Sequence, residues 1–124
     1  MDSVDYCCAE HTAALSKILD LLESPRHCAM TGRTKGALIK VRLSSGQLFD
    51  AARTHIAAKL PLYCQMQTMY DEEPTLGYVI CPLLVDGHRF FCKVFFLKVQ
   101  RECDERLVIS AHEPEFPCPG EKKK

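Results

Sequence analysis

The sequence predicts an α+β domain in which an antiparallel β-meander of four to five strands has two helices packed on one face. Two observations predict it: helical apolar spacing recurs in the first half of the chain, and the second half consists of strand patterns joined by turn residues. Successive hairpins form an antiparallel sheet, whose apolar face needs helices over it. The 124 residues are expected to form one domain over 1–113, followed by an extended or disordered tail over 114–124.

The first predicted helix lies near the N-terminus. Its apolar positions have the i, i+3, i+4, i+7 spacing of one helix face, and they are Leu15, Ile18, Leu19 and Leu22. We expect Ser3 or Asp5 to cap its start, because short polar side chains accept hydrogen bonds from the first free backbone N–H groups. Pro25 disfavours helix at the residue before it and therefore ends this element.

The next part of the chain predicts a loop, a strand and a second helix. Residues 24–36 contain proline and two glycines without periodicity, which is typical of a loop. Alternation over 38–43 predicts a strand, and residues 44–46 predict a turn. The alanine-rich stretch 48–60 favours a helix ended by Pro61, with an apolar face made by Phe49, Ala52, Ile56 and Leu60.

The remaining elements are strands, predicted at 60–70, 78–85, 88–100 and 106–112. Asp86-Gly87 is a strong hairpin signal between the second and third of them. Pro82 cannot donate to a β-ladder, so we expect it at a bulge or on an edge strand, where a partner strand could pair. This order of elements resembles the cone-shaped folds of the NTF2-like superfamily, which implies helices against a curved sheet. The resemblance is one of architecture alone, and no residue's role follows from it.

Both faces of the predicted strand 88–100 are mainly apolar. Alternation places Phe90, Cys92, Val94 and Phe96 on one face, and Arg89, Phe91, Lys93, Phe95, Leu97 and Val99 on the other. Two helices can cover one face of the sheet. If the other apolar face were exposed to solvent, it would form an aggregation-prone patch. The second side could be covered by curling of the sheet, by the 26–36 loop and the tail, or by another chain, or it could line a small-molecule pocket.

From these patterns we expect a non-enzymatic interaction module that forms a dimer or docks a partner protein through an apolar sheet surface. The expected contact residues are Phe91, Phe95, Leu97, Val99, Tyr78 and Ile80. The chain has no hydrolase, metalloprotease or dinucleotide-binding motif, and no cofactor is expected. A small pocket enzyme on a curved sheet remains an alternative, since such enzymes can lack local motifs.

Nucleic-acid binding is a second alternative. Between residues 24 and 49 there are five basic residues and no acidic one, although the formal net charge of the chain is zero. A basic segment can bind a phosphate backbone by charge. The candidate residues are Arg33, Lys35, Lys40 and Arg42.

The chain contains eight cysteines, an even number that raises the question of disulfides. Neither a signal peptide nor an apolar run of membrane-spanning length is recognisable, so we expect a cytoplasmic or nuclear protein that is not in a membrane. Thiols stay reduced there, which predicts mostly free, mostly buried cysteines. No metal site is expected, because no C-x-x-C spacing occurs; the best candidates would be Cys7, Cys8, His11 and Cys28.

Overall fold

The computed structural model describes residues 2–24, 28–67, 75–99, 104–115 and 118. In this part of the chain it contains three helices: α1 (Ala9–Leu22), α2 (Gly32–Lys40) and α3 (Ser45–Ala57). The strands are β1 (Asp2–Ser3), β2 (Cys28–Met30), β3 (Tyr63–Gln67), β4 (Thr75–Val85), β5 (His88–Val99) and β6 (Asp104–His112). The α+β class is therefore confirmed.

The strands form one sheet in the order β1-β3-β4-β5-β6-β2. β3 to β6 pair antiparallel with their neighbours, as the predicted meander requires. The sheet as a whole is mixed, however, because β2 pairs parallel with β6. The prediction of a purely antiparallel sheet is wrong at this edge, because the segment that forms β2 carried only loop signals.

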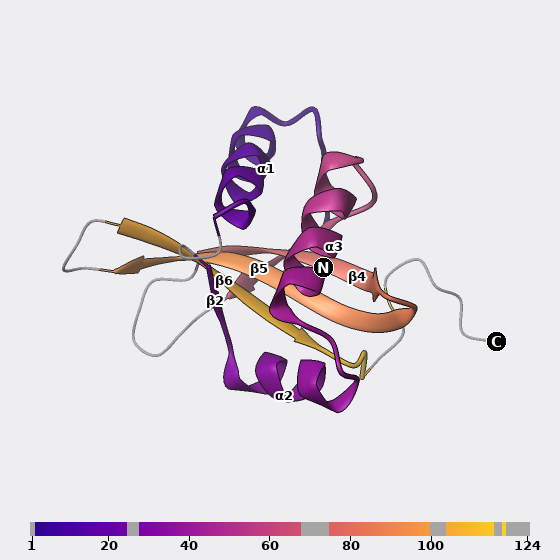
Figure 1. Ribbon diagram of the computed structural model, residues 1–124. Coiled ribbons are helices and arrows are strands. Elements are labelled where there is room, and N and C mark those ends of the chain that lie inside the picture. The colour runs from indigo at the N-terminus through magenta and orange to yellow at the C-terminus, as the bar shows by residue number, and fades with distance from the viewer. Residues whose placement is uncertain (1, 25–27, 68–74, 100–103, 116–117, 119–124) are drawn as a thin grey trace.

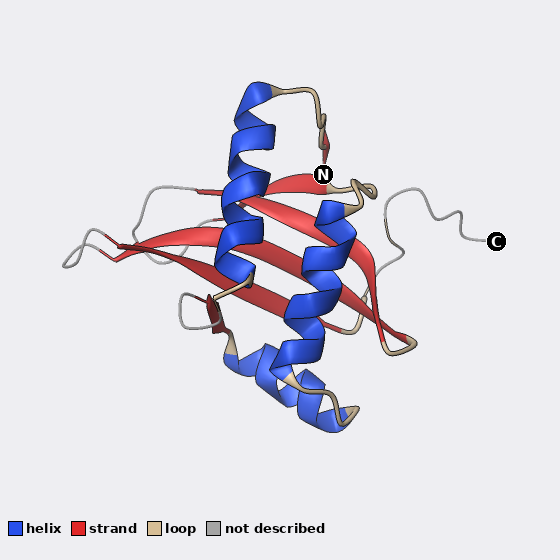
Figure 2. Ribbon diagram, turned by 45° about the horizontal axis from the view of Figure 1, so that its top comes forward, coloured by secondary structure: helices blue, strands red, loops and turns tan. Residues whose placement is uncertain are grey.

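Two helices, α1 and α3, lie side by side over one face of the sheet (Figures 1 and 2). Their apolar faces and that side of the sheet form the main core, which includes Ile18, Leu48, Ile80, Phe90 and Ile109. Burying a large apolar side chain contributes about 1.5–3 kcal/mol. The predicted helices 15–22 and 48–60 are thus the two that hold the sheet from one side.

The third helix, α2, replaces the strand predicted over 38–43. Thr31 caps its N-terminus by accepting a hydrogen bond from the backbone N–H of Thr34. Leu38 is buried and Val41 packs against the core, whereas Ile39 between them is 75% exposed. Six alternating residues fit a strand and a helix turn equally well, so alternation alone could not identify this element.

The flanking predictions at this helix also need correction. The predicted loop 24–36 contains β2 and the start of α2. The predicted turn at 44–46 is the beginning of α3, where Ser44 and Gln47 form a reciprocal capping box. Serine and glycine mark helix starts as well as turns, and the glutamine three residues after Ser44 was the distinguishing signal.

The start of α1 differs from its prediction. Its N-cap residue is Cys8, which makes no side-chain capping hydrogen bond. Asp5 instead accepts a hydrogen bond from the backbone N–H of Cys7, and Ser3 belongs to β1. The helix ends at Leu22, and Pro25 lies outside the described residues.

Pro82 lies at a bulge and not on an edge strand. β4 has β3 on one side and β5 on the other, and its pairing with β5 shifts between Ile80 and Leu83. The peptide bond between Cys81 and Pro82 is cis. The bulge that we predicted is confirmed, and the edge position, with its invitation to a partner strand, is wrong.

α2 packs beside β6, below the pair formed by α1 and α3 in the view of Figure 1. β2 covers the outer edge of β6 only as far as Ile109. Beyond that point the buried Thr34 hydroxyl accepts a hydrogen bond from the backbone N–H of Ala111 at 2.8 Å. Thr34 of α2 therefore provides a hydrogen-bond partner for a backbone N–H at the edge of β6 that would otherwise be buried without one.

One disulfide joins Cys81 of β4 to Cys118, with 5.3 Å between the two Cα atoms. Cys118 lies in the stretch predicted as a tail and is 3% exposed. Five described cysteines are free, but only Cys92 among them is buried. The expectation of mostly buried thiols is therefore wrong, and the eighth cysteine, Cys103, lies outside the described residues.

Candidate functional site

The first face of β5 is closed by the helices. Phe90, Cys92 and Val94 are almost completely buried in the main core. Phe96 is partly buried, and the Lys17 ammonium of α1 lies 5.2 Å from its ring centroid. A cation is attracted to the face of an aromatic ring, so Lys17 helps to cover the last ring of this face.

We call the opposite side of the sheet the second face. Its residues on β3, β4 and β5 are Tyr63, Gln65, Gly77, Val79, Cys81, Leu84, Arg89, Phe91, Lys93 and Phe95. A small buried cluster on it consists of Val79, Cys81 and Cys118, with Tyr63 and Phe91 packed against them. Within the described part of the chain no helix contributes to this cluster, so the second face is covered in a different way from the first.

Two of the predicted contact residues, Tyr78 and Ile80, lie in the core. They share the first face with Phe90, and their side chains are 3% and 0% exposed. The Tyr78 hydroxyl lies 2.9 Å from Nδ1 of His11 on α1, and burial is the main cause that raises the pKa of Tyr78. In the folded chain these two residues have no surface to offer a partner.

The other four predicted contact residues belong to β5, and the side chains of two of them lie outside the described part of the structure. Phe95 is only 3% exposed, so its ring is sheltered within the single chain. Phe91 is partly exposed, and its ring stacks on His112 with 5.2 Å between the centroids. Leu97 and Val99 belong to β5, but their side chains lie outside the described part. Of the six predicted residues, Phe91 is the one that the structure places at the surface of this face.

Lys93 is a charged residue among the mainly apolar residues predicted for this face, and its side chain lies along the sheet surface. Its ammonium donates a hydrogen bond to Oε1 of Gln65 at 3.0 Å, and its side chain passes over Gly77. A Cβ at Gly77 would meet Cε of Lys93 at 2.5 Å, so the glycine makes room for the lysine stem. Lys93 is 7% exposed, and burial lowers its pKa. The middle of the second face therefore presents little charge to solvent.

Leu84 is a surface residue that sequence reasoning missed. It pairs with Arg89 across the hairpin and is 60% exposed, while its neighbours Leu83 and Val85 are in the core. Strict alternation over 78–85 would place Leu84 on the same side as Ile80, but the bulge at Pro82 reverses the faces beyond it. A proline in a strand was the signal that could have revealed this reversal.

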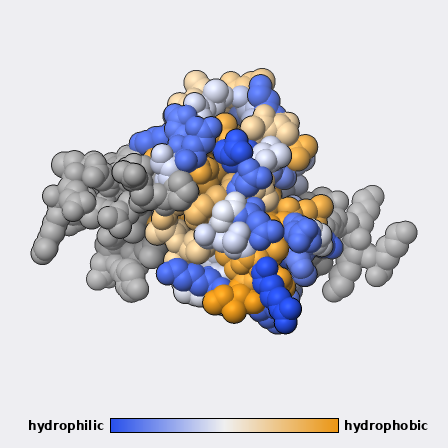
Figure 3. All heavy atoms as spheres, in the orientation of Figure 1, coloured by the Kyte–Doolittle hydropathy of each residue, from blue (hydrophilic) through white to orange (hydrophobic). Residues whose placement is uncertain are grey.

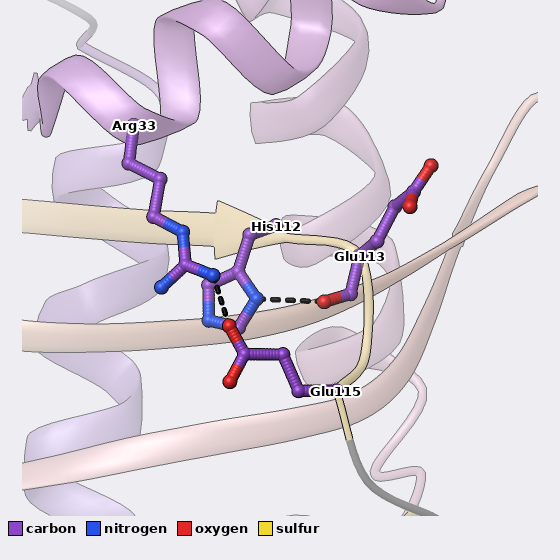
Figure 4. A network of polar contacts seen from close by, with 4 residues as sticks. All are labelled: Arg33, His112, Glu113 and Glu115. Atoms are coloured by element: carbon purple, nitrogen blue, oxygen red, sulfur yellow. Dashed lines mark hydrogen bonds and ion pairs between the residues drawn. The ribbon is translucent and has the colours of Figure 1, made fainter.

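A groove of about 630 Å³ lies between α2, the start of β5 and the segment that follows β6. We call it the α2 groove. Its lining includes Arg33, Lys40, His88, Arg89, His112, Glu113 and Glu115. Four of these residues are shown in Figure 4, where Arg33 reaches from α2 toward Glu115. Three chain segments that are far apart in sequence thus bring cations and carboxylates to one place.

Two ion pairs cross the α2 groove. Arg33 is paired with Glu115, and Nζ of Lys40 lies 3.8 Å from Oε1 of Glu113. The hydrogen bond and the charge of Arg33 are the main causes that lower the pKa of Glu115. His112 Nδ1 lies 2.8 Å from the backbone oxygen of Glu113, which fixes the chain where it leaves β6 (Figure 4).

The structure brings together only two of the four predicted nucleic-acid residues, Arg33 and Lys40. Lys35 is exposed on α2 outside the groove lining, and Arg42 follows the helix with a φ of 59°. The two grouped cations already face carboxylates. The histidines and Arg89 of the groove come from strand positions that the basic segment alone could not indicate.

The candidate metal ligands do not form a cluster. Among the described residues, no three His, Cys, Asp or Glu side chains are placed to hold a metal ion together. His11 contacts Tyr78, and the Cys28 thiol donates to the backbone oxygen of Leu21 at 3.2 Å. Cys7 is exposed, and Cys8 is partly exposed at the start of α1.

Comparison with known proteins finds no matching family model, no similar protein of curated function and no similar solved structure. The resemblance to NTF2-like folds therefore stays a prediction. None of the helices in the described ranges combines the length and the hydropathy that crossing a bilayer requires.

Proposed function

We propose that the protein is a non-enzymatic interaction module, that its docking surface is the second face of the sheet, and that a second copy of the chain occupies this face. The observation that carries the proposal is the apolar character of a sheet face on which no described helix packs. Tyr63, Leu84 and Phe91 are the apolar side chains that remain partly or largely exposed there.

The charge of this face supports a second copy as the occupant. In a twofold dimer each charged residue meets the same surface of the other copy, so exposed like charges would repel. The middle of the second face is uncharged apart from Lys93, which is sheltered and bonded to Gln65. The exposed Arg89 lies at the hairpin end of this face, opposite Leu84. The formal net charge of zero also does little to oppose self-association.

A stable dimer requires a contact surface of sufficient area. A stable interface buries roughly 800 Å² on each partner, with apolar anchors at its centre. The anchors in this account are Tyr63 and Phe91, which pack against the disulfide-linked cluster, and Leu84 at the hairpin end. The rigid cluster beneath them means that docking would order few additional side chains.

The test compares two substitutions of exposed apolar residues by aspartate. Leu84→Asp places a charge on the second face, whereas Ile39→Asp places the same charge on the exposed side of α2. Figure 3 shows that hydrophobic surface is also present in the region of α2. In sedimentation velocity we expect Leu84→Asp to weaken self-association by about tenfold or more, because a buried charge costs at least one to several kcal/mol.

Ile39→Asp should leave the association constant within a factor of about two, as expected of a surface substitution outside the interface. Equal behaviour of the two variants would contradict the assignment of the second face. Circular dichroism of both variants checks that each remains folded.

A further inference from the structure

The segment that follows β6 is a short acidic stretch that forms one wall of the α2 groove. It carries two glutamates, Glu113 and Glu115, on either side of Pro114, and each is paired with a cation of α2. Proline fixes its backbone φ and favours extended chain, so residues 113–115 present their two carboxylates without forming helix. The chain itself shows how an acidic peptide fits beside α2.

The wall of the groove permits close approach of a peptide backbone. Gly36 lies in the lining between Arg33 and Lys40, and a Cβ built on it would have nothing within 4 Å. The helix therefore has a bare stretch between its two cations. A peptide can lie across this stretch while its acidic side chains reach the cations at both ends.

The charge of the groove favours an anionic occupant. Its lining contains three permanent cations (Arg33, Lys40 and Arg89) and two carboxylates, together with two histidines. Both carboxylates belong to the segment after β6, so the parts of the lining that α2 and β5 contribute are basic. Without that segment the groove would be a cationic depression.

The internal pairs hold this segment weakly. The side chains of Arg33 and Glu115 are 60% and 55% exposed, and those of Lys40 and Glu113 are 73% and 67% exposed. Ion pairs between exposed side chains contribute little to stability and are screened by salt. A second acidic segment can therefore replace the first at small cost.

We propose that the α2 groove binds an acidic linear peptide of a partner protein, and that Glu113 and Glu115 pair with the same cations in the free protein. This inference does not depend on the proposed dimer, although the groove adjoins the second face at Arg89, which belongs to both surfaces. The groove recognises alternating carboxylates in extended chain, and the internal segment lowers its apparent affinity for a partner.

The test measures the fluorescence anisotropy of a fluorescein-labelled peptide in which glutamate and proline alternate over seven residues. Three variants of the full chain are compared with the wild type. Glu113→Gln with Glu115→Gln removes the internal competitor, Arg33→Glu with Lys40→Glu reverses the cations of the groove, and Lys35→Glu is the control. Lys35 is on the same helix but outside the groove lining.

We expect the double glutamine variant to bind the peptide about fivefold to tenfold more tightly than the wild type, because the competing carboxylates are gone. The variant with reversed groove charges should bind at least about tenfold more weakly, and the affinity of the wild type should fall as salt is added. The Lys35→Glu variant should stay within about twofold of the wild type, since it changes net charge but not the groove.

Three results would overturn the proposal. One is the absence of binding by both the wild type and the double glutamine variant. Another is an equal loss of affinity in Lys35→Glu and in the variant with reversed groove charges, which would show a general charge effect. The third is selective binding of a single-stranded RNA oligonucleotide through Arg33 and Lys40, which would make this surface a nucleic-acid interface. Sedimentation of the same variants reports separately on the second face.

Discussion

At the scale of single residues, Cys92 shows how strongly this small core excludes water. It lies on the first face of β5 and is fully buried, in contrast to the four other free cysteines of the described part. Burial raises the pKa of its thiol from 9.0 to about 12. A thiol in such a site behaves as a small apolar side chain and not as a nucleophile or ligand.

This shift predicts a loss of stability in alkaline solution. Between about pH 9 and about pH 12 the unfolded chain releases the thiol proton, whereas the folded chain keeps it, so the free energy of unfolding falls as pH rises. Cys92→Ala should lower stability at neutral pH through its cavity but should show a smaller further loss above about pH 9.

Urea titrations at a series of pH values measure this slope. Cys7→Ala is the matched control, because Cys7 is exposed. The control should keep the slope of the wild type. A Cys92→Ala slope that is identical to the wild-type slope would contradict the assigned burial of this thiol.

Phe91, Phe95 and Lys93 show what strand alternation reveals about single residues and what it does not. Their common face follows from the period of two and is correct. The exposure of Phe91 and Lys93 does not follow, because Phe91 packs against the cluster that contains Cys118 and the Lys93 side chain passes over Gly77. Both are contacts between residues far apart in sequence, which no local pattern contains.

At the scale of elements, α2 was the main failure of prediction and has two structural roles. It completes the edge of β6 and forms one wall of the α2 groove. The helices α1 and α3 were predictable because their apolar residues recur over several turns. α2 has nine residues, two of them glycines, and its helical start depends on the Thr31 cap. Such a short element gives too little periodicity to be separated from a strand.

The role of α2 at the sheet edge makes Thr34 a testable residue. In Thr34→Val the side chain keeps its shape but loses the oxygen that accepts the Ala111 N–H, so a buried donor is left without its partner. We expect the free energy of unfolding to fall by about 1–3 kcal/mol.

Thr54→Val on α3 is the matched control, because Thr54 is an exposed helical threonine. Its effect should stay within about 0.5 kcal/mol. Chemical denaturation with urea measures both variants. Equal effects of the two substitutions would show that the Thr34 hydroxyl does not stabilise the edge of β6.

At the scale of the whole molecule, the proposed docking of a second copy follows from the difference between the two sides of the sheet. One side is closed by α1 and α3, and the other carries, among the described residues, a small cluster joined by the disulfide between Cys81 and Cys118. The sequence indicated that both sides are apolar and that two helices cover only one of them. It could not indicate the disulfide, since spacing alone does not show which cysteines meet.

The α2 groove belongs to this same scale, because its residues come from α2, β5 and the end of β6. The basic segment was visible in the sequence, and so were the glutamates near the C-terminus. Their meeting depends on the parallel β2–β6 pair, which brings the start of α2 beside the end of β6. The residues that form β2 carry only loop signals, so this site could not be predicted.

The most direct test of the docking account is multi-angle light scattering of the wild-type protein over a series of concentrations up to the high micromolar range. The account predicts a molar mass that rises from that of one chain toward twice that value. A constant mass of one chain over the whole series would contradict the proposal that a second copy covers the second face.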